Sequence, residues 1–290
     1  MTGGAPGAQQ MTDFLSTHEA AIRLSVFAGV LALMAVLEAL LPRRRTGVTR
    51  LHRWTTNLAL AATGTLLLRL AVPLLATGVA LEAERRGFGL FHWTDATYAV
   101  AFLLSLLALD LMVYGQHVLF HKAGILWRLH RVHHADPHVD ATTGIRFHPV
   151  EILISMGLKM AAVALLGAPV AAVILFEVLL NATAMFNHSN LKIGERTDRF
   201  LRLFIVTPDM HRVHHSVHRD EHDMNFGFSL SLWDRLFGTY RAAPREGHIA
   251  MRLGLAEYPS PAPERFGWSL VNPFSGRSAP DEPQRRERTT

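Results

Sequence analysis

Histidines recur in this chain at spacings that suit metal binding. The pentapeptide His-Arg-Val-His-His, an HxxHH triad, occurs at residues 130–134 and 211–215, and His117 and His121 stand shortly before the first copy. In an α-helix, residues three or four apart lie on one face, with Cβ atoms about 5–6 Å apart. This spacing allows the histidines of each triad to converge on one metal ion. Because imidazole is the commonest metal ligand and the set exceeds what one ion can use, we expect two metals.

Other classes of metal protein fit the pattern less well. A lone HxxxH pair is weak evidence, but two triads and a pair among seventeen histidines, with no tag-like run, favour ligands. The residues inside each triad are Arg and Val, so the HExxH motif of a zinc hydrolase is absent. A transporter or sensor would place its ligands near the bilayer midplane, whereas these histidines lie at the ends of apolar segments. A zinc-dependent membrane hydrolase and a metal-handling protein remain the alternatives.

Composition excludes several kinds of redox centre. The chain has no cysteine, which rules out disulfides, thiolate-ligated haem and cysteine-held iron–sulfur clusters. Its net charge of +5 and pI near 10.1 are compatible with nucleic-acid binding, but no recognition motif is present. The basic residues flank apolar segments instead, so we expect a membrane partner and no nucleic acid.

Apolar blocks predict an all-α membrane protein. The mean hydropathy of +0.17 hides four long apolar segments, and crossing a bilayer takes about 20 apolar residues. These segments are 22–42, 56–81, 95–118 and 150–187. The last is too long for one crossing and is interrupted by Gly167, Ala168 and Pro169, which predicts two helices joined by a tight turn. We therefore expect about four to five spans or re-entrant helices.

Basic residues predict the orientation in the membrane. Five arginines crowd the connection between the first two spans, namely Arg43, Arg44, Arg45, Arg50 and Arg53. The positive-inside rule assigns this connection to the cytoplasm and the N-terminus to the outside. Counting five crossings then brings the segment from His117 to His148, and everything from His188 to the end, to the cytoplasmic side. The histidine site and the C-terminus are expected there.

Neighbouring polar residues could support the ligands. Asp110 and Tyr114 continue the helical stripe of His117, seven and three residues before it. A carboxylate within a span is costly, and ligand histidines often donate their second N–H to a carboxylate. Asp110 is therefore expected to hold a ligand ring, or to pair with Arg69 in the second span. His148, beside Pro149, could be a ligand or a supporting group.

The end of the last apolar stretch offers a ninth ligand. His188 lies where the chain should emerge beside the triads, so it is the better candidate. The predicted ligands are His117, His121, His130, His133, His134, His188, His211, His214 and His215. The remaining histidines lack the spacing or position and are expected at surfaces or interfaces: His18, His52, His92, His138, His218, His222 and His248. The aromatic segment 225–239 is expected to form a membrane-surface patch closing the site.

The ordered motifs between Asp110 and Tyr240 resemble the fatty acid hydroxylase and sterol desaturase superfamily. The matching segments are Asp110 to His121, Leu126 to His134, Arg146 to Glu151, His188 to Asn190, Pro208 to His215 and Trp233 to Thr239. The resemblance implies a helical transmembrane stalk, a cytosolic cap with two non-haem iron ions, and oxygen-dependent hydroxylation or desaturation of a lipid C–H bond. Sterols, fatty acyl or sphingolipids, alkylglycerol ethers and carotenoids are all open as substrates. The residues expected to support the ligands are Asp110, Tyr114, His148 and Asn190.

One position departs from the family pattern. Some lipid hydroxylases of the superfamily have a further histidine four positions before the residue that resembles His188, and here that position is Ala184. The site could then have nine ligands or fewer, or use His148 or water. No fused haem domain is recognisable, so electrons should come from a separate protein. We expect a flexible tail over 1–20, a membrane and cap domain over 21–257, and a loose tail over 258–290.

Overall fold

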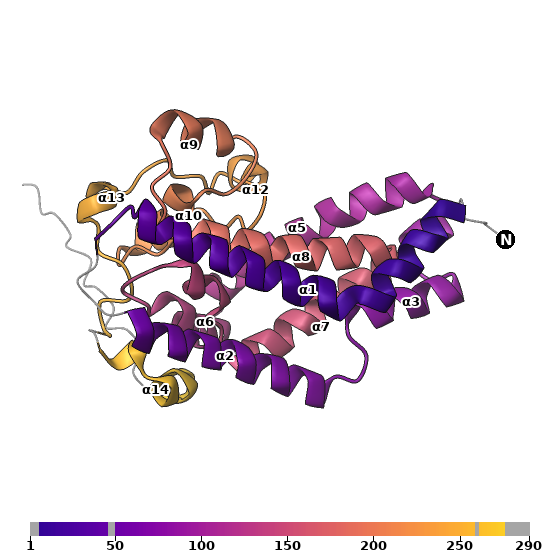
Figure 1. Ribbon diagram of the computed structural model, residues 1–290, viewed down its shortest axis with the longest axis horizontal. Helices are drawn as coiled ribbons and strands as arrows, with labels where there is room; N and C mark the ends of the chain where they lie inside the picture. Colours follow the sequence, from indigo (N-terminus) through magenta and orange to yellow (C-terminus); the bar gives the residue numbers. More distant parts are fainter. Residues whose placement is uncertain (1–5, 46–49, 259–260, 276–290) are drawn as a thin grey trace, which may run out of the picture.

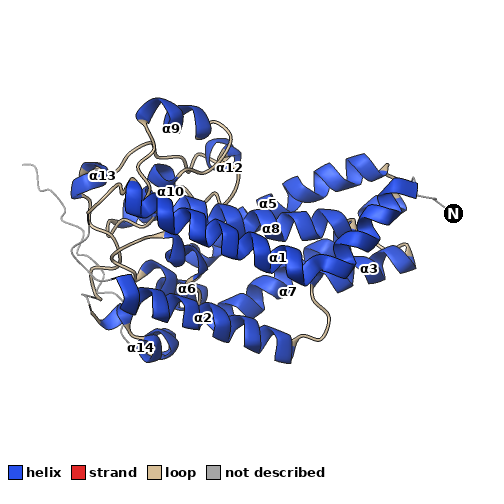
Figure 2. Ribbon diagram, viewed as in Figure 1, coloured by secondary structure: helices blue, strands red, loops and turns tan. Residues whose placement is uncertain are grey.

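The computed structural model describes residues 6–45, 50–258 and 261–275. Over these ranges the protein consists of helices and loops, with no strand (Figure 2). Long helices run along the longest axis as a stalk, and most of the short helices gather at one end as a cap (Figure 1). The predicted all-α architecture is confirmed.

The helices of the stalk and the cap alternate along the chain. The stalk comprises α1 (Pro6–Leu40), α2 (Arg50–Ala71), α3 (Ala76–Arg86), α4 (Leu90–Trp93), α5 (Tyr98–Lys122), α7 (Pro149–Leu166) and α8 (Val170–His188). The cap comprises α6 (Gly124–His134), η1 (Ala141–Ile145), α9 (Glu195–Leu201), α10 (Pro208–His214), α11 (Arg219–His222), α12 (Leu232–Leu236), α13 (Gly247–Ala250), η2 (Ala262–Glu264), α14 (Phe266–Val271) and η3 (Asn272–Phe274). Because α5 and α8 end at the cap, these stalk helices contribute side chains to it directly.

Five stretches of helix are long and apolar enough to cross a membrane. They are Thr17–Leu40, Arg50–Trp93, Tyr98–Lys122, Pro149–Leu166 and Val170–His188. Large apolar side chains are exposed along them, such as Leu66, Leu103 and Leu165, as expected for surfaces that face lipid. The chain is therefore a membrane protein, and the predicted number of spans agrees with the structure.

The predicted turn within the last apolar stretch is confirmed. Residue 167 ends α7 in the left-handed conformation, with φ of +64°, which glycine adopts without strain. A Cβ atom at Gly167 would lie 2.6 Å from Cδ2 of His92 and 2.7 Å from the carbonyl oxygen of Phe88. The position thus requires glycine for both its conformation and its packing against α4.

The predicted span over 56–81 lies within one candidate span, but it is not a single helix. The helix ends at Ala71 and restarts at Ala76, because Pro73 lacks an N–H and disfavours helical geometry in the residue before it. The uniformly apolar composition of the stretch concealed this break. The candidate span Arg50–Trp93 is accordingly made of α2, α3 and α4.

Both predicted tails contain helix. Residues 6–20 belong to α1, while residues 1–5 lie outside the described ranges. At the other end, residues 261–275 form η2, α14 and η3 against the cap, and residues 276–290 are not described. The packing of this C-terminal segment depends on distant arginines, which local composition did not reveal.

Arg146 joins the C-terminal segment to the rest of the cap. Its guanidinium is buried and donates to Asn57 Oδ1 at 2.7 Å, and to the carbonyl oxygens of Val132 and Pro263 at 2.8 and 2.7 Å. It also donates to Ser269 Oγ at 2.9 Å. Hydrogen bonds of this charged kind contribute about 1.5–3 kcal/mol each, so Arg146 ties α2, α6 and α14 together.

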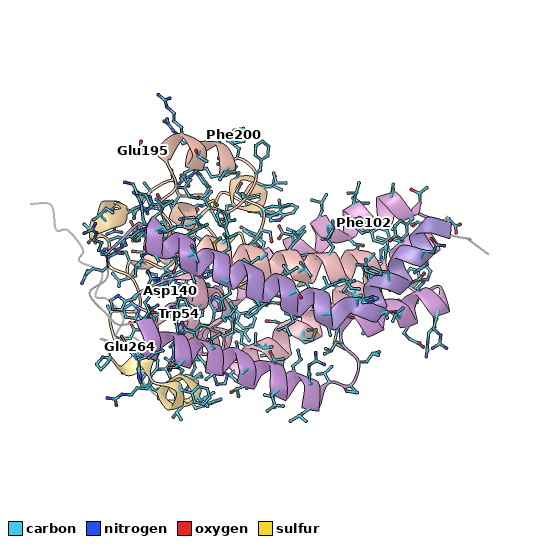
Figure 3. All side chains as sticks on the ribbon, in the orientation of Figure 1. Trp54, Phe102, Asp140, Glu195, Phe200 and Glu264 are labelled. Carbon is cyan, nitrogen blue, oxygen red and sulfur yellow. The ribbon has the colours of Figure 1, made fainter. Side chains whose placement is uncertain are left out.

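A second buried arginine holds α2 against the loop after α6. Arg53 binds the carboxylates of Asp136 and Asp140 at 2.8 and 3.0 Å. Trp54 Nε1 donates to Asp140 at 3.1 Å, and Figure 3 labels both at the cap end of the molecule. Because each buried charge has partners, the cap is fixed to the stalk on this side.

Charges inside the apolar part of the stalk are also paired. Glu177 on α8 forms ion pairs with Arg23 on α1 and with Lys159 on α7, the latter at 2.6 Å. Arg23 also contacts Glu19 one helical turn away, and Thr77 on α3. An unpaired charge is costly within a bilayer, so this network specifies how α1, α3, α7 and α8 pack.

Gly167→Ala should destabilise the protein. Left-handed geometry costs a residue with a Cβ atom about 1–2 kcal/mol, and the methyl group would also meet His92 and Phe88. We expect a lower thermal unfolding midpoint in detergent. Gly157→Ala is the matched control within α7, because nothing lies within 4 Å of its Cβ position. Alanine there should stabilise by roughly 0.5–1 kcal/mol. Equal effects of the two changes would contradict this account of the turn.

Candidate metal centre

Nine histidine side chains converge where the stalk meets the cap. They form a five-histidine group of His117, His121, His130, His134 and His214, and a four-histidine group of His133, His188, His211 and His215. Within each group, one ring nitrogen per residue lies within 4.8 Å of all the others. These are the nine residues predicted from spacing and position, and all are buried.

The two groups are immediate neighbours. The rings of His134 and His215, one from each group, have centroids 4.6 Å apart. The rings of His133 and His134 lie 5.3 Å apart, as adjacent residues of α6. The arrangement therefore suits two metal ions held side by side.

The expectation that each triad serves one metal is wrong. His130 and His134, four residues apart on α6, belong to the five-histidine group, whereas His133 belongs to the other. In the second triad, His211 and His215 stay together in the four-histidine group and His214 crosses over. With 3.6 residues per turn, side chains four apart differ by about 40° around the helix axis and those three apart by about 60° the other way. The middle histidine of each triad, His133 or His214, therefore points to the neighbouring group.

The Nε2 atoms of the histidines face one another. Nε2 of His121 lies 3.1 Å from that of His134, and Nε2 of His188 lies 3.1 and 3.0 Å from those of His133 and His211. The Nε2 atoms of the remaining members are buried and unpartnered, namely His117, His130, His214 and His215. Nitrogens bound to one metal at about 2.0–2.1 Å, at right angles, would lie about 3 Å apart. The donor set fits metal ions.

Several of the opposite ring nitrogens are held by hydrogen bonds. Nδ1 of His117 lies 2.8 Å from the Phe226 carbonyl oxygen, and Nδ1 of His214 lies 2.8 Å from that of Met224. Nδ1 of His188 lies 2.7 Å from the Ala184 carbonyl oxygen, one turn earlier on α8. A carbonyl can only accept, so it places the proton on Nδ1 and leaves Nε2 free for a metal.

A buried carboxylate, that of Glu151, also contacts a ring of the five-histidine group. Its Oε1 lies 2.7 Å from Nδ1 of His130, and both side chains are buried. The sequence placed Glu151 in the motif beside His148 but did not assign it this role. Because Pro149 starts α7 and His148 caps it, Glu151 in the first turn faces α6.

Burial keeps the rings of the cap neutral. It lowers the pKa of His130 to about 3. Burial and neighbouring imidazoles hold the pKa of the other cap histidines well below the ordinary value: His133, His134, His211, His214 and His215. Neutral imidazole is the form that binds metal, so the rings are ready to do so at physiological pH.

Aromatic side chains enclose the rings. Phe147 stacks on His133, with centroids 4.6 Å apart and planes 6° apart. Phe226 lies 5.1 Å from His121, and Phe228 lies within 6.4 Å of His188. Such walls exclude water and strengthen electrostatic interactions within the site.

The four residues expected to support the ligands make other contacts. Asp110 accepts from Trp233 Nε1 at 2.9 Å and from the Leu230 amide at 3.2 Å, rather than from a histidine or Arg69. The Tyr114 hydroxyl pairs with Thr239, His148 caps α7, and Asn190 binds the backbone of Arg44. These four residues hold together the elements around the site. Other groups, brought there by tertiary packing, contact the rings instead.

The sequence predicted His222 at a surface or interface and gave no role to Asp223. With His121 these residues form a third group of possible ligand atoms at the edge of the five-histidine group. Asp223 Oδ1 lies 3.4 Å from Nδ1 of His121, and the His222 ring stacks on Trp127 at 5.4 Å. Lys122 binds the same carboxylate at 2.7 Å, which favours a role in orienting His121 over binding a further cation.

Asp234 organises the loop that accepts from His117. Its carboxylate oxygens accept from the amides of Phe226 and Gly227, both at 2.8 Å, and from Thr239 Oγ1 at 2.7 Å. Burial raises the pKa of Asp234 to about 6. The sequence assigned this segment to a membrane-surface patch. The isolated carboxylate among aromatic residues was the signal that could have revealed the role of Asp234 in holding the loop.

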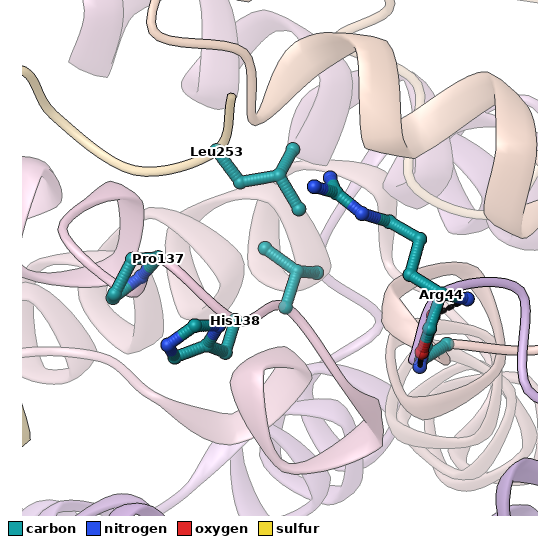
Figure 4. A pocket seen from close by; sticks show the side chains of 6 residues that line it. Arg44, Pro137, His138 and Leu253 are labelled. Carbon is teal, nitrogen blue, oxygen red and sulfur yellow. Dashed lines mark hydrogen bonds between the residues drawn. The ribbon is translucent and has the colours of Figure 1, made fainter. Parts of the chain in front are cut away.

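A small pocket lies elsewhere on the cap. Figure 4 shows Arg44, Pro137, His138 and Leu253 around it, and Val139 and Asn190 complete its lining. It contains none of the nine histidines, and its volume of about 20 Å³ holds little more than one water molecule. The candidate metal centre is therefore a different place.

A family model for fatty acid hydroxylases matches residues 102–239. The match contains all nine histidines of the two groups. The predicted resemblance to the fatty acid hydroxylase superfamily is confirmed over this segment.

The relatives of the chain include several lipid-modifying enzymes. An ornithine lipid hydroxylase of Rhizobium tropici is 29% identical over 228 residues, which are 76% of this chain and 67% of that protein. An alkylglycerol monooxygenase of Danio rerio is 30% identical over 56% of this chain and 35% of its own. A cholesterol 25-hydroxylase of Homo sapiens is 29% identical over 49% and 51%, respectively.

The extent of these similarities differs. The chain spans about two thirds of the ornithine lipid hydroxylase, but only about half or a third of the other two. No solved structure matches the chain. By name the relatives are hydroxylases and monooxygenases of lipids, which confirms the expectation of an oxidoreductase of this lipid-modifying family.

Replacing one histidine of either group should lower the metal content. His133→Ala removes a donor from the four-histidine group, and His214→Ala removes one from the five-histidine group. We expect less metal per chain in both variants, measured by plasma mass spectrometry after purification in detergent without chelators. His218→Ala is the control, because His218 is bound to Glu246 outside both groups. Full metal content in His133→Ala would refute the assignment.

Glu151→Gln should weaken metal binding without removing a ligand. The charge that orients His130 and raises its basicity would be lost, and such changes cost about 10- to 100-fold in metal affinity. Competition with a fluorescent chelator measures the loss. Glu195→Gln, on the exposed surface of α9, should bind as the parent does. An unchanged affinity in Glu151→Gln would show that the contact with His130 has no such role.

Proposed function

We propose that this protein is a membrane-bound non-haem di-iron oxygenase that hydroxylates a lipid C–H bond. The observation that carries the proposal is the pair of adjacent groups of five and four buried histidines. The chain resembles the fatty acid hydroxylase family, and its relatives are lipid hydroxylases and monooxygenases by name. Those names favour hydroxylation over desaturation as the outcome.

The nine histidines are proposed to hold two iron ions. Imidazole also suits copper, nickel and zinc, so iron follows from the family resemblance rather than from the ligands. When bound, the two ions would use dioxygen and external electrons to oxidise an unactivated C–H bond. The chain contributes fixed tautomers, through the carbonyl oxygens of Phe226, Met224 and Ala184.

Aromatic walls and location favour a lipid substrate. Phe147, Phe226 and Phe228 keep bulk water from the rings, and His117 and His188 project from helices that cross the bilayer. A lipid chain can reach such a site from the membrane without passing through water. An ornithine lipid or a related aminoacyl lipid is our first candidate, because that relative covers the most of this chain.

The site is proposed to face the cytoplasm. The arginine-rich connection between α1 and α2 lies beside it, since Arg43 binds Asp209 at 3.0 Å and the backbone of Arg44 binds Asn190. These partners are close neighbours in sequence of the ligands His211 and His188. The positive-inside rule then puts the arginines and the site on one side, whatever the number of spans. A separate cytoplasmic protein would deliver the electrons.

A single-turnover experiment tests this function. The protein, purified with its metals, would be inserted into nanodiscs of total bacterial lipid, reduced with dithionite without oxygen, and exposed to oxygen-18. We expect oxygen-18 in a lipid hydroxyl group, detected by mass spectrometry, and none with His133→Ala. Chemical reduction removes the need for the unidentified electron donor. Zinc as the sole metal, or no labelled lipid from iron-loaded protein, would overturn the proposal.

A further inference from the structure

Six large apolar side chains are exposed on the cap, outside the spans. They are Phe200, Leu203, Phe204, Leu232, Leu236 and Phe237, and between 48% and 64% of each residue is exposed. They come from the end of α9, the residues after it, and α12 with the residue that follows. We name this set the apolar crest. An exposed apolar patch of this kind usually marks a contact surface.

Both parts of the apolar crest are joined to each other. The amide of Val206 donates to the Ser229 carbonyl at 2.9 Å, and the amide of Ser231 donates to the Phe204 carbonyl at 3.1 Å. The Ser231 hydroxyl and the Arg235 guanidinium both donate to the carbonyl of Arg202. The crest is therefore one continuous surface of the cap.

The apolar crest is also attached to the spans. Trp233 of α12, and Leu230 just before this helix, donate to Asp110 in the middle of α5. The Phe237 ring stacks on Tyr114 of α5, with centroids 5.4 Å apart. Thr183 of α8 forms a hydrogen bond with Ser229 at 3.0 Å. The exposed side of α12 thus continues the lipid-facing surface of α5, where Leu107 and Leu111 are exposed.

These contacts set the depth of the apolar crest. Asp110 and Tyr114 lie twelve and sixteen residues beyond Tyr98, where α5 begins. At 1.5 Å per residue, these are about 18 and 24 Å along the helix axis. The hydrocarbon core is about 30 Å thick. With Tyr98 at its far edge, α12 would touch α5 at a level that still lies within the bilayer.

Side chains on α9 have the order expected at a membrane surface. Figure 3 labels Phe200 at the end of α9 turned toward the stalk, and Glu195 at the end turned away from it. Arg196, Arg199 and Arg235 are exposed beside the apolar residues. Their long side chains can reach the headgroups while the apolar residues enter the acyl region, and basic residues favour anionic lipids.

We propose that the apolar crest inserts into the leaflet on the side of the metal centre and anchors the cap on the bilayer. Its occupant is lipid, at the boundary between headgroups and acyl chains. The cap would then touch the membrane at two places, through its stalk and through the crest. The surface around α5, α8 and α12 would be closed to water next to the histidines.

Cysteine labelling tests the insertion directly, because the chain has no cysteine of its own. Phe204→Cys and Leu236→Cys would each carry an environment-sensitive nitrobenzoxadiazole label, in the full chain in nanodiscs of phosphatidylcholine and phosphatidylglycerol. Glu195→Cys on α9 is the matched control. We expect several-fold weaker quenching by iodide at positions 204 and 236 than at 195, together with quenching by lipids brominated near the headgroup.

Two outcomes would overturn the proposal. Equal iodide quenching at 204, 236 and 195 would mean that the apolar crest lies in water. Protection from iodide without quenching by brominated lipids would mean that protein covers it, such as a second copy of the chain. Metal content and elution volume of each labelled protein would verify its fold, and Phe200→Cys provides the same measurement if Phe204→Cys does not fold.

Discussion

The structure depends on burying nine neutral imidazoles whose Nε2 atoms meet one another. A buried nitrogen without a partner costs about 1–3 kcal/mol, and four of these atoms lack one while five face only other histidines. Metal ions satisfy all of them at once. Acceptors on the outer side of the rings, such as the Phe226 carbonyl and Glu151, hold the imidazoles in the orientation that this convergence requires.

Helical periodicity explains why the two groups cannot form separately. Every pair of ligands four residues apart stays within one group, as His117 and His121 do, while His133 and His214 cross between groups. Two short helices, α6 and α10, therefore each contribute to both groups. A rigid-body shift of either helix would disturb both groups together, so the HxxHH spacing would fix the distance between two bound ions as well as their ligands.

Local patterns predicted the nine converging histidines and most of the spans, because spacing along a helix and apolar length are properties of contiguous sequence. The turn at Gly167 followed from the same kind of signal, whereas the break at Pro73 was hidden in an unbroken apolar run. Contacts between distant segments could not be predicted. Glu151 against His130 and Arg146 against Ser269 depend on how α6, α7 and α14 pack, which no local pattern encodes.

Membrane depth links the fold to selectivity. His117 lies nineteen residues beyond the start of α5, which is about 28 Å along the helix and close to the hydrocarbon thickness of about 30 Å. The same rigid helix faces lipid and carries ligands, so the distance from the bilayer to the metal centre is fixed. A lipid entering from the membrane would then present to the metals the part of its chain that lies near its headgroup. Depth, rather than a polar pocket around the substrate, would choose the C–H bond.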